Sequence, residues 1–106
     1  MAETFRMYNQ TVTTSNANVY VSPANTTSII ILGQIANIDA VNPTEVYVFA
    51  TDSGNTSTRF LAKKMPVPAQ AATTFLTGKL VLEAGDYLTA NANANCDITI
   101  SVLQIT

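Results

Sequence analysis

The longest apolar run in the sequence, residues 27–38 (TSIIILGQIANI), constrains the fold more than any other stretch. In an extended chain successive side chains point to opposite faces, so one face would carry Ile29, Ile31 and Ile35. The other face would carry a second apolar set: Ile30, Leu32, Ala36 and Ile38. The β-branched isoleucines and the internal Gly33 favour a strand over a buried helix. A strand that is apolar on both faces needs two covers, either two layers of its own domain or a core on one side and a partner subunit on the other.

The rest of the sequence consists of short alternating segments separated by turn signals. Strands are predicted at residues 5–12, 19–21, 27–38, 45–50, 58–64, 73–82 (with a break allowed at Gly78), 87–94 and 98–105. Residues 52–55 (DSGN) are predicted to form the tip of a hairpin, and residues 66–69 (PVPA) a bend between sheets, because proline lacks the N–H that a strand ladder requires. About eight short strands and no convincing helix predict an all-β fold, an antiparallel β-sandwich or jelly roll, in a single domain covering residues 1–106.

The end of the chain adds a second apolar excess. Ile98, Ile100 and Val102 are predicted to face the core, but Leu103 and Ile105 then fall on the outward face. Either a bulge resets the register there, or something outside the sandwich covers this face. Together with the central run, these positions offer more apolar strand surface than one small sandwich needs. We therefore predict an interface made by Ile30, Leu32, Leu103 and Ile105.

The composition argues against several kinds of chemistry. The chain has no histidine, which eliminates Ser-His-Asp and Cys-His nucleophilic arrangements and histidine metal sites. Most of the aspartates fall in or beside predicted turns, where this residue normally caps backbone amides. A calcium site at Asp52 and Asn55 lacks the dense acidic spacing of a calcium loop. We predict that the protein is not an enzyme and that it has no catalytic, cofactor-binding or metal-ligating residues.

Charge and hydropathy limit the partners. Seven acidic and five basic residues give a net charge of −2, without the clustered lysine and arginine that nucleic acid requires. No apolar run approaches the roughly 20 residues of a membrane helix, and the first residues lack a signal-peptide pattern. Cys96 is the only cysteine and is predicted to be a small buried residue rather than a reactive thiol. We therefore expect neither nucleic acid nor a membrane as a partner.

Several stretches share a layout with a known class of proteins. They are FRMYNQTV at the start, VYVSPANTTSIIILGQIANID with its Pro-Ala turn before the apolar run, FLAKKMPVPAQAATTFLTGKLVLEAGDYLTA with its Val-Pro-Ala and Leu-Glu-Ala-Gly-Asp turns, and DITISVLQIT at the close. In this layout the chain resembles the small virion structural proteins of tailed bacteriophages. The resemblance implies a β-sandwich that works as a homo-oligomer, expected to be a trimer. It also implies assembly in the host cytoplasm, residence in the virion, and contacts with the major capsid protein or other virion proteins.

Within that class, the expected role is that of a capsid decoration (cement) protein that stabilises the head lattice. A tail, neck, baseplate or fibre component is the first alternative. The second is a lectin-like receptor-binding module whose aromatic and amide side chains would contact sugars: Tyr8, Tyr20, Tyr47, Tyr87, Asn91, Asn93 and Asn95. Against the second stands the ordinary use of these residues, because tyrosine packs in cores and cross-strand pairs and asparagine fills turns.

Overall fold

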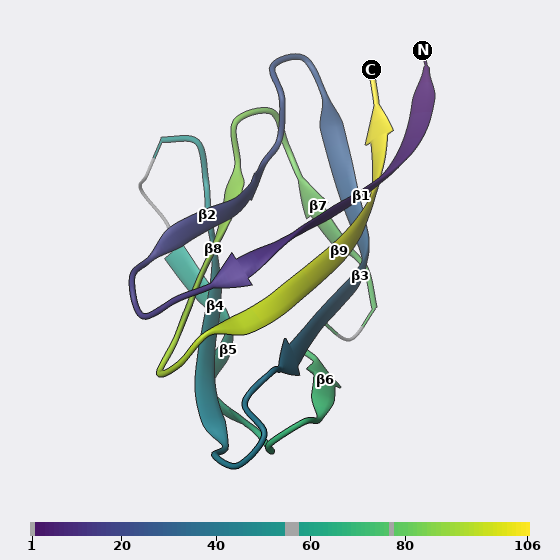
Figure 1. Ribbon diagram of the computed structural model, residues 1–106. Coiled ribbons are helices and arrows are strands. Elements are labelled where there is room, and N and C mark those ends of the chain that lie inside the picture. Colours follow the sequence, from purple (N-terminus) through teal and green to yellow (C-terminus); the bar gives the residue numbers. More distant parts are fainter. Residues whose placement is uncertain (1, 55–57, 77) are drawn as a thin grey trace.

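The computed structural model describes residues 2–54, 58–76 and 78–106, which form nine strands in two packed antiparallel sheets (Figure 1). The first sheet runs in the order β1 (Glu3–Val12), β9 (Cys96–Ile105) and β3 (Thr27–Asn37), with β6 (Ala72–Thr74) and β7 (Leu80–Leu82) both paired to β3. The second sheet runs in the order β2 (Ala17–Val21), β8 (Tyr87–Ala92), β4 (Thr44–Thr51) and β5 (Thr58–Val67).

The connections make this sandwich a jelly roll. Most successive strands lie in opposite sheets, and the β4–β5 hairpin stays within the second sheet. The short strands β6 and β7 pair with successive parts of β3, so they occupy one strand position in two pieces. Gly78, between them, has φ of 92°, a left-handed conformation that glycine adopts without steric cost. Eight strand positions in two sheets with this order are the jelly-roll arrangement, which confirms the predicted fold class and the predicted break.

The core lies between the two sheets and is almost entirely aliphatic. Its fully buried side chains include Val12, Ile30, Ile35, Val46, Val48, Val67, Leu88, Ile98, Ile100 and Val102. In β9 the buried residues alternate without interruption from Cys96 to Val102. That strand also keeps one register with β1 along its whole length, so no bulge resets β9. Leu103 and Ile105 therefore belong to the outward face, which rules out the first sequence interpretation, a bulge in β9 that resets the register.

A bulge lies instead in β3. Ile30 is opposite Val102 and Leu32 is opposite Ser101, which leaves Ile31 as an extra residue in the ladder. A one-residue insertion reverses the side-chain parity of everything that follows. Ile30 and Ile35 consequently both point into the core, although simple alternation had placed them on opposite faces.

One predicted bend is wrong. Pro66 and Val67 belong to β5, where Pro66 is opposite Glu45 and Val67 is fully buried. The strand tolerates proline because β5 is at the edge of its sheet, where a missing N–H breaks no ladder between central strands. The predicted β4–β5 hairpin is confirmed by the pairing of these strands; Asn55, in its predicted tip, lies outside the described residues.

A buried polar network crosses the core near the chain ends. The Tyr20 hydroxyl is 2.7 Å from the Ser28 hydroxyl, which is 2.8 Å from the Ser22 hydroxyl. The Gln104 side-chain amide donates to the hydroxyls of Tyr20 and Tyr8, at 2.8 and 3.3 Å. Since buried polar groups are costly unless they are bonded, this network fixes the relative position of β1, β2, β3 and β9.

Candidate interaction surface

The outer face of the first sheet carries a row of apolar side chains that crosses four strands. Phe5 of β1 is directly opposite Leu103 of β9, and Leu103 is opposite Ile29 of β3. Ile29 is in turn opposite Val81 of β7. Directly opposed residues in antiparallel strands share a face and lie about 5 Å apart at Cβ. The four side chains therefore form one continuous apolar row.

Further apolar side chains widen this row. Met7 and Leu32 flank Ser101 in the next row, Ile105 ends β9 on the same face, and Ile31 projects from the bulge. We call the whole set the outer apolar patch: Phe5, Met7, Ile29, Ile31, Leu32, Val81, Leu103 and Ile105. Phe5 is 71% exposed, Met7 64% and Val81 56%.

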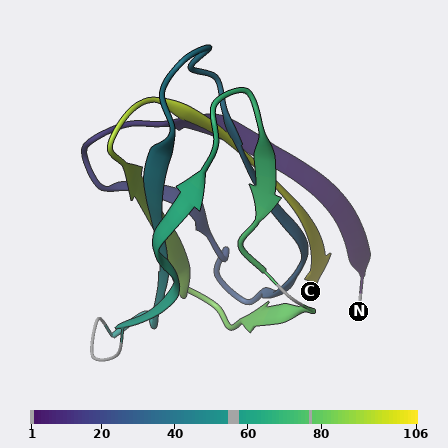
Figure 2. The same cartoon turned by 90° about the horizontal axis from the view of Figure 1, so that it is seen from below.

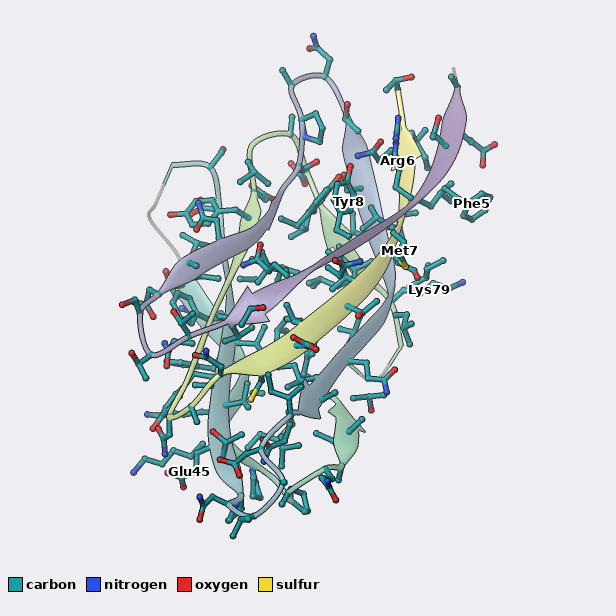
Figure 3. All side chains as sticks on the ribbon, viewed as in Figure 1. Phe5, Arg6, Met7, Tyr8, Glu45 and Lys79 are labelled. Atoms are coloured by element: carbon teal, nitrogen blue, oxygen red, sulfur yellow. The ribbon has the colours of Figure 1, made fainter. Side chains whose placement is uncertain are left out.

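The patch is hollowed at one place. Phe5, Arg6, Met7, Ile31, Ser101 and Val102 surround a shallow depression of about 350 Å³. Figure 3 shows the Phe5 side chain pointing away from the body of the molecule. Large apolar groups that are exposed together on a small domain are typical of interaction surfaces.

Along β1 and β9, the part of the same sheet face beyond the patch is polar. Asn9 is opposite Thr99, and Thr11 is opposite Asp97. Gln34 of β3 continues the first of these rows. The outer face is therefore divided along β1 and β9, with the apolar half near the chain ends and the polar half near the β8–β9 turn. A molecule that covers the apolar half would have the polar half as its margin.

The structure places three of the four predicted interface residues on the patch and the fourth in the core. Leu32 lies on the patch at 39% exposure, and Leu103 and Ile105 are half-buried there. Ile30 has no exposed surface and packs in the core, so its side chain does not reach the outer face. The reason is the bulge at Ile31, which sequence alternation does not reveal. Whether the other three contact a partner is a proposal taken up below.

Phe5, Met7 and Val81 are patch residues that sequence reasoning did not assign to an interface. Phe5 and Met7 share one side of their strand in the sequence pattern, and Tyr8 lies on the other. The pattern does not say which side faces the core. The structure decides it, because Tyr8 joins the buried polar network and Val12, four residues later, is 1% exposed.

Backbone hydrogen bonds and burial shift the pKa values of Asp39 and Cys96, respectively. The backbone N–H groups of Asn42 and Val41 donate to the Asp39 carboxylate at 3.0 and 2.8 Å, and these bonds lower the pKa of Asp39. Burial raises the pKa of the Cys96 thiol. Among the residues that the structure describes, no three or more His, Cys, Asp or Glu side chains gather as metal ligands. Over the same part of the chain, no helix is long and apolar enough to cross a membrane.

The four tyrosines of the sugar-binding alternative fall into two groups: Tyr8 and Tyr20 pack on each other, whereas Tyr47 and Tyr87 lie on the outer face of the second sheet. Tyr8 and Tyr20 lie together in the interior, with ring centroids 5.0 Å apart. Tyr47 is in the second sheet opposite Asn91, whose side-chain amide donates to Asn16. The side-chain amide of Asn93 is bonded to Glu45 at 3.2 Å. These aromatic and amide groups are thus spread over both sheets.

Comparison with known proteins places the fold. No family model matches the sequence, and no curated protein sequence is significantly similar to it. A chain of the T13 viral particle of IBDV, an icosahedral virus, superposes with a TM-score of 0.60 at 9% identity, covering 97% of this chain and 31% of that chain. The present chain therefore spans about a third of the length of the IBDV chain.

Two further structures are similar. A chain of the Bacillus endospore appendages, which are disulfide-linked pili, gives a TM-score of 0.51 at 12% identity, covering 96% of this chain and 85% of that chain. A pentameric capsid protein from metagenomic phage sequences gives a TM-score of 0.48 at 17% identity, covering 90% of this chain and 59% of that chain. The IBDV and appendage comparisons, at such low identities, establish a shared jelly-roll fold.

Proposed function

We propose that this protein is a non-enzymatic structural component of a virus particle, and that it acts as a capsid decoration protein on the head of a tailed bacteriophage. The observation that carries the proposal is the outer apolar patch. Phe5 and Met7 are large, unbranched at Cβ and mostly exposed, and Phe5 continues into Leu103 and Ile29 without a polar break in its row. A protein that worked alone in solution would lose solubility through this surface and gain nothing from it.

The fold supports the same role. The jelly roll is shared with a chain of an icosahedral viral particle, and capsid proteins are among the proteins that use it. The resemblance of the turn motifs to virion proteins of tailed bacteriophages points in the same direction. Low charge, at 11% of residues, suits a surface that becomes buried, because charged residues are depleted at the centre of interfaces.

The proposal includes self-association and contact with the major capsid protein. The resemblance implies three copies, and this number remains a prediction. A chain of disulfide-linked pili shares the fold, but a disulfide between copies is not supported here, because the single cysteine, Cys96, has no exposed surface.

Particles made by the genome that encodes the chain provide the test. We expect mass spectrometry of purified particles to detect the chain, and immunogold labelling to place it on the head. Labelling confined to the tail or baseplate would replace decoration with the first alternative. Particles that lack the chain, or infection blocked by a soluble glycan that binds it, would overturn the proposed role.

A binding assay connects that role to the patch. Particles assembled without the gene should bind added wild-type protein and become more resistant to heat. Phe5→Asp should bind much more weakly, because it sets a charge in the centre of the apolar row. Asn9→Asp is the matched control, since it adds the same charge to the polar half of the same strand and face, and it should bind normally.

A further inference from the structure

One edge of β1 is free. The hydrogen bonds between β1 and β9 show which β1 residues direct their N–H and C=O groups to that edge. The Ala2 N–H donates to the Thr106 carbonyl at 3.1 Å, and the Thr106 N–H donates to the Ala2 carbonyl at 2.9 Å. Such doubly bonded pairs alternate with unbonded pairs along an antiparallel ladder. The β1–β9 register continues from this pair without a shift. The residues whose N–H and C=O groups point away from β9 are therefore Glu3, Phe5, Met7, Asn9 and Thr11.

The other sheet edges are blunted in ways that β1 is not. The edge strand β5 has Lys63 and Lys64, Pro66 and two irregularities in its register. The strands β6 and β7 have three residues each, and β2 has five with a register shift. By contrast, β1 has ten residues in a regular register and contains neither lysine nor proline. An unprotected edge of this length is a template for another strand.

The free edge and the outer apolar patch meet at the same residues. Phe5 and Met7 direct their backbone groups to the open edge and their side chains to the outer face. Figure 2 shows β1 (purple) as the outer margin of its side of the sandwich. A strand added here would receive backbone hydrogen bonds and apolar contact together, which is how strand addition combines affinity with specificity.

We propose that the partner is a second copy of this chain, and that two β1 strands pair antiparallel about a twofold axis through Met7. In the joined sheet, the core-facing sides of both copies must lie on the same side. This requires odd-numbered residues to be opposite odd-numbered ones and even-numbered residues opposite even-numbered ones. With the axis at Met7, all residues from Glu3 to Thr11 are paired, Met7 is opposite Met7, and Phe5 of each copy is diagonal to Met7 of the other. The two outer apolar patches then form one surface across both copies.

The sequence of β1 selects this register over its neighbours. An axis at Arg6 would set two arginines directly opposite each other, and like charges so placed are destabilising. An axis at Tyr8 would set Met7 opposite Asn9 and Phe5 opposite Thr11, so no apolar outer residue would be opposite another. With the axis at Met7, Arg6 is opposite Tyr8, whose ring is a favourable neighbour for a guanidinium group. An axis at Phe5 would pair only the first half of the strand.

This inference rests on the proposed function and deepens it, because it names the partner of the free β1 edge. It predicts a pair and not the trimer that the resemblance implies. Pairing is measured on the purified chain, whereas the proposed function is tested on particles. A failure of one therefore does not look like a failure of the other.

Light scattering over a range of concentrations tests the pairing. The wild-type chain should have a mass of twice 11.3 kDa. Met7→Lys sets two charges against each other on the axis and should raise the dissociation constant roughly tenfold or more, with an unchanged circular dichroism spectrum because the Met7 side chain is exposed. Gln34→Lys makes the same change in charge on the exposed outer face of β3, outside the paired strand, and should still pair.

Cross-linking tests the register independently. With the axis at Met7, the two Met7 Cα atoms lie about 5.5 Å apart, within the range that a disulfide spans, so Met7→Cys should form a covalent pair on oxidation. The two Asn9 Cα atoms lie roughly 14 Å apart, so Asn9→Cys should not. A wild-type monomer or trimer, a Met7→Lys protein that pairs normally, or equal cross-linking of both cysteine variants would overturn the inference.

Discussion

Gly33→Ala should destabilise the fold, because this residue has no room for a side chain. A Cβ atom at Gly33 would lie 2.4 Å from Cζ of Phe75 and 2.8 Å from each of its Cε atoms. The Phe75 ring is 6% exposed, and its backbone N–H donates to the Gly33 carbonyl at 3.2 Å. The ring must therefore leave the core, or the strand must shift. Overpacking of a core costs about 1–3 kcal/mol, and exposing a phenylalanine costs about the same.

We expect Gly33→Ala to lower the free energy of unfolding by about 2 kcal/mol, which is a fall in melting temperature of roughly 10 °C for a domain of this size. Urea and thermal unfolding followed by circular dichroism measure both quantities. The double variant Gly33→Ala with Phe75→Leu should recover part of the loss relative to the sum of the single changes, because a shorter side chain leaves space for the methyl group. A Gly33→Ala protein as stable as the wild type would refute this account of the contact.

Three further predictions follow from burial. Ile35→Asp should prevent folding, because it places an unpaired charge at a fully buried position. Ile31→Asp should fold and lose only association, because Ile31 is 39% exposed. Circular dichroism would measure the folding of each variant and gel filtration its association. Ser28→Ala should cost about 1–3 kcal/mol in urea unfolding, because the buried hydroxyl of Tyr20 loses a partner at 2.7 Å. The Cys96 thiol, whose pKa is raised by burial, should react with a thiol reagent only on unfolding. Since its folded pKa lies above the unfolded value, stability should fall as pH rises above about 9, and Cys96→Ala should remove that part of the pH dependence.

The strands and the fold class were accessible from the sequence because alternation and turn chemistry are local signals. The hairpin between β4 and β5 and the break at Gly78 were found from residue types alone. The bulge at Ile31 could not be predicted from the sequence, because every residue near it is apolar. Either assignment of alternate residues to the two faces therefore gives a plausible strand. Ile30 was therefore assigned to the interface, although it packs in the core.

The outer apolar patch could be predicted only in part. Leu103 and Ile105 were placed on the outward face because they break the pattern of a strand whose core face was already clear. Phe5 and Met7 were not, since the first strand alternates in two acceptable ways and only its pairing with β9 decides between them. Pro66 was misplaced for a similar reason, because its tolerance depends on β5 being an edge strand, a property of the sheet order.

The division of one strand position into β6 and β7 has a consequence for how far an assembly can grow. A sheet that extends through β1 meets, at its other end, two three-residue strands separated by a connection, and these give an incoming strand no continuous ladder. Growth by strand addition is therefore self-limiting: a twofold contact uses up the one open edge of each molecule and leaves nothing for a third. Extension of this chain into a fibril by strand addition is thus prevented, and any larger assembly must grow through side-chain surfaces instead.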